Sequence, residues 1–235
     1  MTFRTRVVIP LLLVTAGIVG GVARLVYLGA RAAQAAARKS HCNGNLCFLG
    51  LAMLEYHEKY GHFPPAFVAD KDGRPMHSWR ALLLEFTEPR LFKAYNFSEP
   101  WNSNANQVVA RQMPTPYACP ENVAGRAAGF TNYVVVVGKN TLFPEAHTTK
   151  LKDVPSDPGR TILLVEIADS DILWLEPRDL SFDSMSFELN DKTQPSIGSV
   201  HPGGANFCMA DGTRRSLEVN PAELKRLMTI RRDEQ

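Results

Sequence analysis

An apolar run without charged residues follows two arginines at the start of the chain and extends over residues 7–23. Extended to Leu28 it has about 22 residues, enough to cross the hydrocarbon core of a bilayer as a helix. We therefore predict a short N-terminal segment (residues 1–6) and a transmembrane helix (residues 7–28). A cleaved signal peptide is the alternative, because two Ala-x-Ala sequences between residues 33 and 37 fit a cleavage site.

A helical pattern continues after this run. Residues 29–40 are rich in Ala, Arg and Gln, which favour helix. Apolar residues then recur at steps of three and four, as on the buried face of an amphipathic helix: Leu46, Leu49, Met53, Tyr56 and Tyr60. Gly61 and Pro64-Pro65 end the pattern. We predict one helix over residues 7–60. Residues 29–61 form a stem that docks on a domain of residues 62–235.

The rest of the chain alternates short apolar runs with turn residues. Strands are expected over residues 132–137 and 161–168, and Asp211-Gly212 predicts a tight hairpin over residues 205–217. Helices are expected over residues 78–86 and from Asn220, a residue type that caps helices, onward. The predicted class is α+β with an antiparallel sheet.

Composition excludes some classes of function. Hydrophobic residues make up 45% of the 235 residues and charged residues 21%, which is typical of a globular body. The 26 Lys and Arg nearly balance the 24 Asp and Glu, so we expect no nucleic-acid binding. No G-x-S-x-G elbow, phosphate loop or dinucleotide fingerprint is present, so we predict no enzyme and no cofactor. His57 and His62 are five residues apart on a helix, which does not match the zinc motif H-E-x-x-H.

Cysteines and polar clusters leave alternatives open. The chain has no C-x-x-C pair. In an exported protein, a Cys42–Cys119 disulfide would tie the stem helix to a loop. The alternative is buried free thiols, which suits Cys208 inside a strand. Three carboxylates after a strand, Glu166, Asp169 and Asp171, form either a calcium site or, as we favour, a solvated acidic loop.

The most distinctive stretch combines His, Gly and Asn near the predicted hairpin. The residues are His201, Gly203, Gly204, Asn206, Asp211 and Gly212. Glycines permit a sharp turn, and the polar side chains could bind a cation or ligand. We favour the structural interpretation, in which the side chains bond to the backbone of the turn.

Motifs between about residues 40 and 217 together resemble a large bacterial family, domain of unknown function 1559 (DUF1559), whose members have pilin-like N-termini. The segments that carry the resemblance are Cys42-x-x-Asn45-Leu46, Gly50-Leu51-Ala52, Tyr56-His57, residues 60–65, Ser78-Trp79-Arg80, Pro100-Trp101-Asn102 with Asn106, Cys119-Pro120, Thr131-Asn132-Tyr133, residues 160–166, Trp174 to Leu180, and residues 201–206 with Asp211-Gly212-Thr213. The resemblance implies a pseudopilin-like architecture with a long helix, half in the membrane, packed on an extracytoplasmic antiparallel sheet. It implies no enzymatic activity and supplies no catalytic residues.

The start of the chain differs from that of the family. A prepilin peptidase site has Gly before Phe and a Glu shortly after, whereas residues 2–6 here are Thr-Phe-Arg-Thr-Arg. A family body on a plain signal anchor therefore fits better than a processed pilin. The positive-inside rule favours a cytoplasmic body, because more Lys and Arg follow the apolar run than precede it, whereas the resemblance favours an exported one.

Our leading hypothesis is a single-pass protein of the cytoplasmic (inner) membrane whose exported domain is a structural or interaction module. Its expected partners are the lipid bilayer and envelope or secretion-assembly proteins. The alternative is an extracytoplasmic protein that binds a small solute or a cation such as calcium. We assign no catalytic, cofactor or metal residues, and the family-signature residues with a structural or ligand role are Glu166, His201, Gly203, Gly204, Asn206, Asp211 and Gly212.

Overall fold

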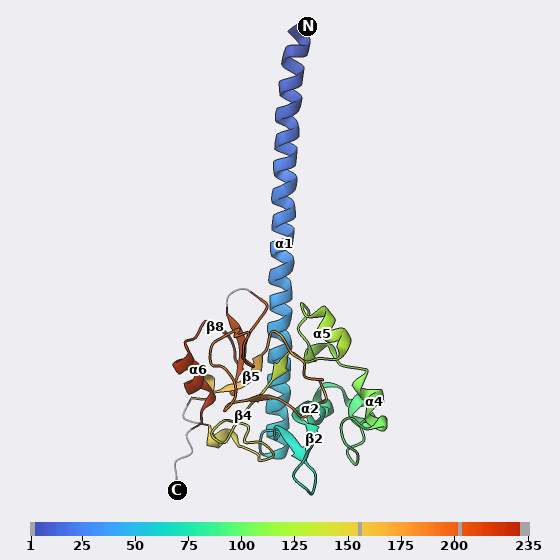
Figure 1. The fold of residues 1–235 in the computed structure, drawn as a ribbon, viewed down its shortest axis with the longest axis vertical. Helices are drawn as coiled ribbons and strands as arrows, with labels where there is room; N and C mark the ends of the chain where they lie inside the picture. The colour runs from blue at the N-terminus through green and yellow to red at the C-terminus, as the bar shows by residue number, and fades with distance from the viewer. Residues whose placement is uncertain (1–2, 155–156, 202–203, 231–235) are drawn as a thin grey trace. The chain divides into compact units, whose positions relative to one another are not determined.

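The computed structural model describes residues 3–154, 157–201 and 204–230, and the side chains of residues 3–16 and of Leu217 lie outside that description. The chain divides into two units, Met1–Ser40 and His41–Gln235. The second unit carries all the sheets and all the helices after the first (Figure 1).

One continuous helix, α1, runs over Phe3–Tyr60 and confirms the predicted long helix. It ends at Gly61, whose φ of 77° suits glycine and whose N–H donates to the His57 carbonyl at 2.8 Å. In the first unit, Val22, Leu25 and Val26 are exposed. Among the described residues, no helix is long and apolar enough to cross a membrane. The side chains of residues 7–16, which belong to the predicted transmembrane helix, lie outside the description.

The second unit is built on a four-stranded antiparallel sheet with strand order β3-β5-β7-β8, which confirms the predicted class. The expected hairpin forms between β7 and β8, and the expected strand at residues 161–168 is β5. Two small two-stranded sheets, β1-β2 and β4-β6, accompany it. The strands are β1 (Phe67–Ala69), β2 (Pro75–Ser78), β3 (Tyr133–Val134), β4 (Val136–Val137), β5 (Ile162–Glu166), β6 (Leu180–Ser181), β7 (Ala205–Met209) and β8 (Arg214–Leu217).

The strand predicted over residues 132–137 is wrong in one respect, because it is two short strands. β3 ends at Val134 and β4 begins at Val136, and the two belong to different sheets. Between them, the Val135 N–H donates to Asp179 Oδ1 at 3.0 Å instead of joining either sheet. β4 then pairs with β6 in parallel, so antiparallel pairing does not hold throughout.

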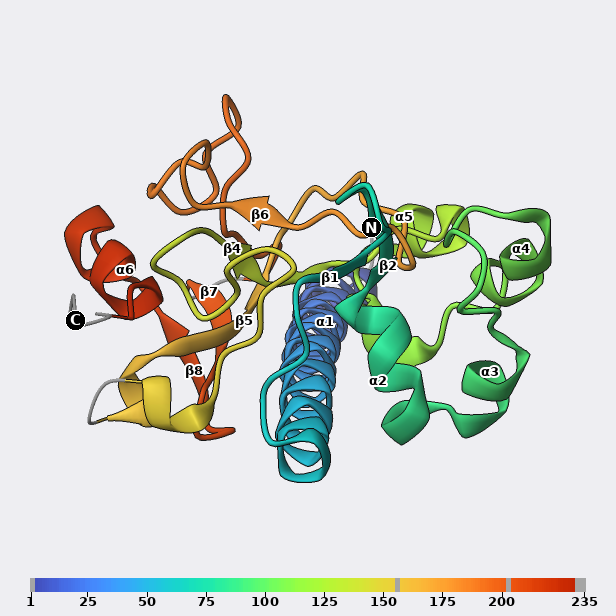
Figure 2. The same cartoon turned by 90° about the horizontal axis from the view of Figure 1, so that it is seen from below.

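Both faces of the main sheet are buried. The part of α1 over residues 41–60 covers one face, where Leu46, Leu49 and Met53 are fully buried (Figure 2). Gly50 lets the helix approach β7, since a Cβ at this position would lie 2.2 Å from Cys208 Sγ. The expectation that Tyr60 belongs to the buried stripe is wrong: it is 44% exposed and its hydroxyl donates to Glu85.

A last helix, α6 (Pro221–Met228), covers the opposite face, where Leu224 and Leu227 pack with Val165 and Phe207. It begins as the sequence predicts, with the Asn220 side chain accepting from the Glu223 N–H at 2.9 Å.

Four further helices lie on the other side of α1 from the main sheet (Figure 2). They are α2 (Trp79–Thr87), α3 (Pro89–Ala94), α4 (Asn104–Ala110) and α5 (Val123–Ala128). The first was predicted, and Ser78 caps it. Its Arg80 is fully buried and forms a 2.7 Å ion pair with Asp179, which fixes the loop before β6. Short 3-10 helices lie at Thr115–Tyr117, Leu151–Asp153 and Pro158–Arg160.

Candidate functional site

Four metal-ligating side chains from distant parts of the sequence meet inside the second unit: Cys42, Cys119, Glu166 and His201. One ligand atom of each lies within 4.8 Å of those of the other three. Cys42 Sγ donates to Glu166 Oε1 at 3.0 Å, and Cys119 Sγ lies 3.3 Å from His201 Nε2. Their exposed fractions range from 0% for Cys42 to 6% for His201, so the cluster is closed to solvent.

Helix α1 positions both cysteines of the cluster. Cys42 and Asn45 are three residues apart and therefore share one face of the helix. The Asn45 side-chain amide donates to the Ala118 carbonyl at 3.1 Å, directly before Cys119 in the chain. The helix thus supplies one thiol and holds the loop that supplies the other.

The segment Thr131-Asn132-Tyr133 joins the cysteine loop to the sheet. Asn132 Oδ1 accepts from the Cys119 N–H at 3.0 Å, and its amide donates to the Ile167 carbonyl, also at 3.0 Å. Tyr133, on β3, donates from its hydroxyl to Cys42 Sγ at 3.1 Å. These bonds connect the loop that carries Cys119, the end of β5 and α1, so the segment fixes the cluster from a second side.

The sheet supplies the carboxylate. Glu166 is the last residue of β5 and is 1% exposed. Its Oε2 accepts a short hydrogen bond from the Asn206 amide on β7, and Asn206 Oδ1 in turn accepts from the Ser216 hydroxyl on β8 at 2.6 Å. Glu166 therefore faces donors with both oxygens, and three neighbouring strands determine its position.

A loop brings the histidine to the cluster. The His201 N–H donates to Ser199 Oγ at 3.1 Å, and the Ser199 N–H donates to Asn190 Oδ1 at 2.9 Å. The Gly198 N–H donates to the Glu166 carbonyl at 3.0 Å, which ties this loop to the end of β5. Gly203, which we singled out from the sequence, lies outside the described residues.

The environment of the cluster keeps the Cys42 thiol and the Tyr133 hydroxyl protonated in this structure. The hydrogen bond with Cys119, burial and the negative charge of Glu166 together raise the pKa of the Cys42 thiol well above its ordinary value. Burial raises the pKa of Tyr133 in the same way. Two sulfurs, an imidazole nitrogen and a carboxylate oxygen form a donor set of the kind that binds Zn²⁺. Because all four side chains are buried, a substrate has no contact surface on them.

Other residues singled out from the sequence lie elsewhere. Asp211 is exposed at the turn between β7 and β8, where its Oδ1 accepts from the Thr213 N–H at 2.8 Å. Gly212 has a φ of 81° in the same turn, and Gly204 a φ of 88° just before β7. These positions have the geometry of a structural turn. His57 Nε2 accepts from the Leu151 N–H at 3.0 Å, as expected for a histidine packed against loops.

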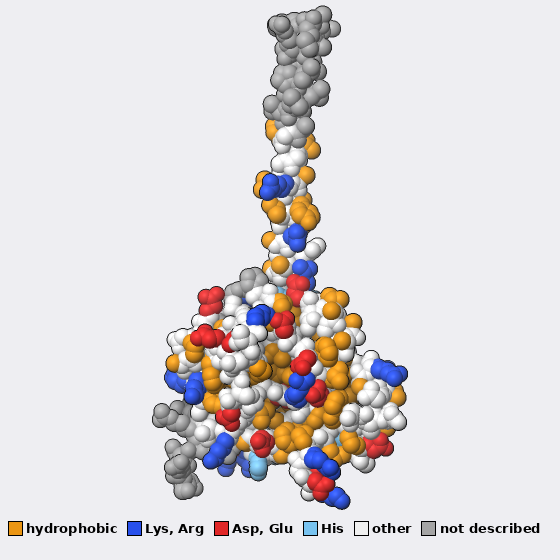
Figure 3. Space-filling view, in the orientation of Figure 1, with side chains coloured by type: hydrophobic (Ala, Val, Ile, Leu, Met, Phe, Trp, Pro, Cys, Tyr) orange, Lys and Arg blue, Asp and Glu red, His pale blue; other side chains and the backbone are white. Residues whose placement is uncertain are grey.

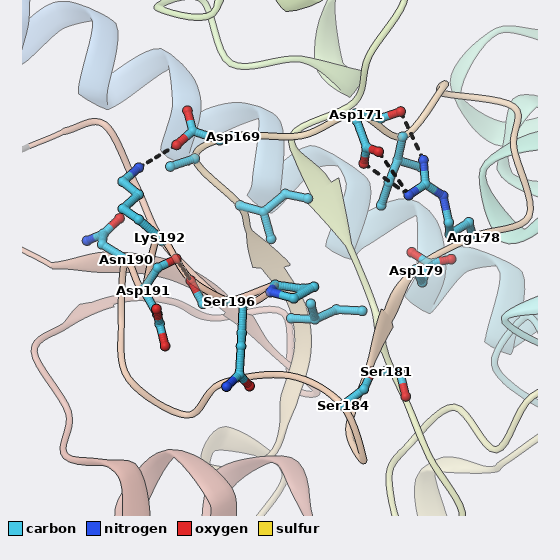
Figure 4. Close-up of a pocket in the computed structure, with 17 residues that line it drawn as sticks. Asp169, Asp171, Arg178, Asp179, Ser181, Ser184, Asn190, Asp191, Lys192 and Ser196 are labelled. Atoms are coloured by element: carbon cyan, nitrogen blue, oxygen red, sulfur yellow. Dashed lines mark hydrogen bonds and ion pairs between the residues drawn. The ribbon is translucent and has the colours of Figure 1, made fainter.

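The three carboxylates considered for calcium do not converge. Glu166 points into the buried cluster, whereas Asp169 pairs with Lys192 and Asp171 pairs with Arg178 at 3.0 Å. The two ion pairs lie at separate walls of a cavity of about 400 Å³ between residues 167–172, 178–184 and 190–198 (Figure 4). Asp179 also lines this cavity, but Trp79, Arg80 and the Val135 N–H already bind its carboxylate.

All four cysteines are free thiols in the structure. Cys42 and Cys119 nevertheless belong to the same buried cluster. A disulfide between them stays a prediction.

Sequence reasoning noted all four residues of the cluster but not their convergence. Asn45, Asn132 and Tyr133 were recognised as motif residues without a role, and they turn out to position the ligands.

Comparison with known proteins identifies one family. A family model described as "Protein of unknown function (DUF1559)" matches residues 31–163, which include Cys42 and Cys119 and precede Glu166 and His201. The match confirms the resemblance inferred from the motifs. No curated protein matches the chain, and neither does any solved structure.

Proposed function

Since this chain belongs to the DUF1559 family of proteins of unknown function, we propose its function from the geometry of the buried cluster: it is a zinc-binding protein. The observation that carries the proposal is the convergence of Cys42, Cys119, Glu166 and His201 within 4.8 Å. Zinc–ligand bonds of roughly 2.0–2.3 Å place the ligand atoms of a tetrahedral site about 3.3–3.8 Å apart. The observed separations of 3.0 and 3.3 Å for two pairs, and of at most 4.8 Å for the others, require adjustments of up to about 1 Å.

The chemistry of the donors selects the ion. Ca²⁺ and Mg²⁺ prefer six or more oxygen ligands, whereas this cluster offers two sulfurs, one nitrogen and one carboxylate. Thiolates are soft ligands that favour Zn²⁺, and four protein ligands complete its tetrahedral coordination. The cation-binding alternative drawn from the sequence therefore becomes a zinc site rather than a calcium site. Because no position is left for a water or substrate, the site is structural rather than catalytic.

The proposed ion stabilises the second unit by linking elements that are distant in the sequence. Cys42 lies on α1, Cys119 on a loop before α5, Glu166 on β5 and His201 on the loop before β7. The contact between Cys42 and Glu166 alone spans 124 residues. An ion bound to the folded chain and not to the unfolded chain stabilises the fold by mass action.

Cobalt substitution tests the proposal. The full chain, prepared without metal, is titrated with Co²⁺, and the thiolate-to-cobalt charge-transfer band and the d–d bands of tetrahedral Co²⁺ are recorded. We expect one equivalent to bind and Zn²⁺ to displace it. Cys42→Ser removes one ligand, and Cys47→Ser on the same helix is the matched control, because Cys47 lies outside the cluster.

We expect a strong thiolate-to-cobalt band in wild type and in Cys47→Ser. In Cys42→Ser the band should disappear or Co²⁺ should bind more weakly. His201→Ala should act like Cys42→Ser. A Cys42→Ser spectrum equal to that of Cys47→Ser would exclude the cluster as the site, and no band in any form would exclude soft-metal binding. Circular dichroism of each variant separates loss of the metal from loss of the fold.

A second proposal concerns the place of the protein in the cell. We infer that α1 attaches the chain to the cytoplasmic membrane and that the second unit is an extracytoplasmic structural or interaction module of an envelope assembly. The support is the apolar sequence of residues 7–28, the exposed Val22, Leu25 and Val26 on the first unit, and membership of the family. The expected protein partners, which are envelope or secretion-assembly proteins, are part of this proposal.

Fractionation and protease accessibility test the second proposal. The full chain should remain with membranes after a carbonate wash, whereas a chain lacking residues 1–28 should not. Protease added to intact spheroplasts should digest the second unit if it is exported and should spare it if it is cytoplasmic. Recovery of the full chain in the carbonate supernatant would contradict attachment through α1.

A further inference from the structure

A second cavity lies between α4, α5 and residues 173–175, and we call it the α4–α5 cavity. Its volume is about 330 Å³, at the lower end of the range for small-molecule sites. Its lining includes Trp101, Met113, Leu173 and Trp174, together with two arginines, Arg111 and Arg126. It shares no residue with the cysteine cluster.

The charges of this cavity are all of one sign. None of its lining residues is Asp or Glu. Arg126 donates to Thr115 Oγ1 at 3.0 Å, and within the described residues neither Arg126 nor Arg111 forms an ion pair. Glu176, which follows the lining segment, already binds Arg178 at 2.7 Å. Two arginines therefore line one cavity whose lining has no carboxylate to neutralise them.

The larger cavity of Figure 4 shows the opposite arrangement. Its cations, Lys192 and Arg178, are each paired with an aspartate of the same cavity. An incoming anion would have to displace these aspartates. The α4–α5 cavity presents no such competitor, and an anion entering it gains charge-assisted hydrogen bonds directly.

Apart from Gln107, the remaining lining residues are apolar or glycine, and Trp174 and Leu173 are held in place. Trp174 is 1% exposed, its indole N–H donates to the Ala110 carbonyl at 2.7 Å, and its ring lies 5.4 Å from that of Tyr117. Leu173 is 38% exposed and covers Gly129, where a Cβ would lie 3.7 Å from its side chain. Hydrophobic side chains also gather on the face that carries α5 in Figure 1 (Figure 3).

We infer that the α4–α5 cavity binds a small organic anion, in which a carboxylate lies against Arg111 and Arg126 and an apolar or aromatic group lies against Trp101, Met113 and Leu173. Guanidinium groups recognise carboxylates through paired N–H donors, and the volume fits a small molecule rather than a peptide segment. The inference does not depend on the zinc site, since the two sets of residues are separate.

Titration with 4-fluorobenzoate tests the inference on the full chain, followed by ¹⁹F NMR and calorimetry. 4-Fluorobenzamide has nearly the same shape without the charge and tests the role of the carboxylate. Arg111→Gln with Arg126→Gln removes both cations. Arg90→Gln with Lys93→Gln on α3 is the matched control, because both residues are exposed and lie outside the cavity.

We expect 4-fluorobenzoate to bind wild type and the α3 control equally. The cavity variant should bind it about ten- to a hundred-fold more weakly, since hydrogen bonds to charged groups contribute that much. Leu173→Ala should weaken 4-fluorobenzoate binding but not acetate binding. The inference is overturned if the cavity variant and wild type bind alike, if the benzamide binds as well as the benzoate, or if inorganic phosphate competes as strongly as the benzoate.

Discussion

Replacement of Arg80 by Met tests the buried ion pair that holds the second unit together. The Arg80 side chain is 0% exposed and Asp179 is 2% exposed. Arg80 donates to Asp179 Oδ1 at 2.7 Å and to three backbone carbonyls of residues 174, 176 and 178 at 2.7–3.1 Å. Met has a similar length but no donors, so the change removes the charge and the hydrogen bonds while largely retaining the packing.

The expected loss is large because the partner charge stays buried. Breaking a buried ion pair by removing one member costs about 3–5 kcal/mol, and carbonyls left without donors place this variant at the upper end. In a domain of this size each kcal/mol lowers Tm by about 2–4 °C, so Tm should fall by roughly 6–20 °C. Arg90→Met, at an exposed position of α3, should change stability by less than about 0.5 kcal/mol.

The pH dependence distinguishes a charge effect from a packing effect. Burial raises the pKa of Asp179 from 3.8 to about 6, although Arg80 opposes the shift. Because the folded pKa exceeds the unfolded pKa, the stability from protonating Asp179 is fully present below about pH 4 and is lost as the pH rises through about 6. Without Arg80 this pKa rises further, so the variant loses less stability at about pH 5 than at about pH 8.

Urea denaturation followed by tryptophan fluorescence at these two pH values measures both quantities. Wild type and Arg90→Met are compared with Arg80→Met at each pH. A loss below about 1 kcal/mol at about pH 8 would refute the assignment of a strong structural role to the pair. An equal loss at both pH values would refute the assignment of the loss to the Asp179 charge.

Three further predictions follow from single positions. Gly50→Ala should destabilise the second unit by about 1–3 kcal/mol, because the added Cβ would lie 2.2 Å from Cys208 Sγ. Gly44→Ala, whose Cβ has nothing within 4 Å, should be neutral or stabilise the helix. Urea denaturation of both variants measures the difference, and equal stability of the two would contradict the close approach at Gly50. Asn220→Ala should cost about 0.5–2 kcal/mol through loss of the cap of α6, and an unchanged urea midpoint would contradict that role. If the proposed zinc site is correct, a chelator should lower the Tm of wild type but not that of Cys42→Ser, and equal shifts in both would exclude a stabilising ion at this cluster.

The elements that the sequence predicts well are those whose signals are local. The α1 helix follows from consecutive helix-favouring residues, and the β7–β8 hairpin follows from Asp211-Gly212 between two short strands. The caps Ser78 and Asn220 both accept hydrogen bonds from the helices that follow them. In each case, residues within one or two turns of each other determine the structure.

The errors arise where distant residues decide. The strand over residues 132–137 is interrupted because Asp179, 44 residues away, accepts from the Val135 N–H. The helix over residues 78–86 is predicted, but no local signal indicates that Arg80 is buried, because its partner Asp179 lies 99 residues further along. Tyr60 fits the helical period but lies one turn beyond the point where the body covers α1, so it binds Glu85 at the surface.

The cluster itself combines both situations. The residues Cys42, Cys119, Glu166 and His201 each stand in a recognisable motif, but no spacing between them matches a known metal signature. Their separations, such as 82 residues between Cys119 and His201, are set by the packing of α1 on the sheet rather than by local geometry. A pattern search based on short ligand spacings therefore misses a site of this kind.

Cys42 and Cys119 form either a disulfide or two ligands of a zinc ion, and the two interpretations differ in the groups that they leave unused in the core. A disulfide uses two of the four converging groups and leaves Glu166 with the hydrogen bond from the Asn206 amide. A divalent cation uses all four groups. Its charge of +2 combines with two thiolates and one carboxylate to give a net charge of about −1. The Tyr133 hydroxyl donates a hydrogen bond to Cys42 and the Asn206 amide donates one to Glu166, so both help to stabilise this charge. Since both interpretations leave about one buried negative charge, we favour the ion because it uses the complete donor set.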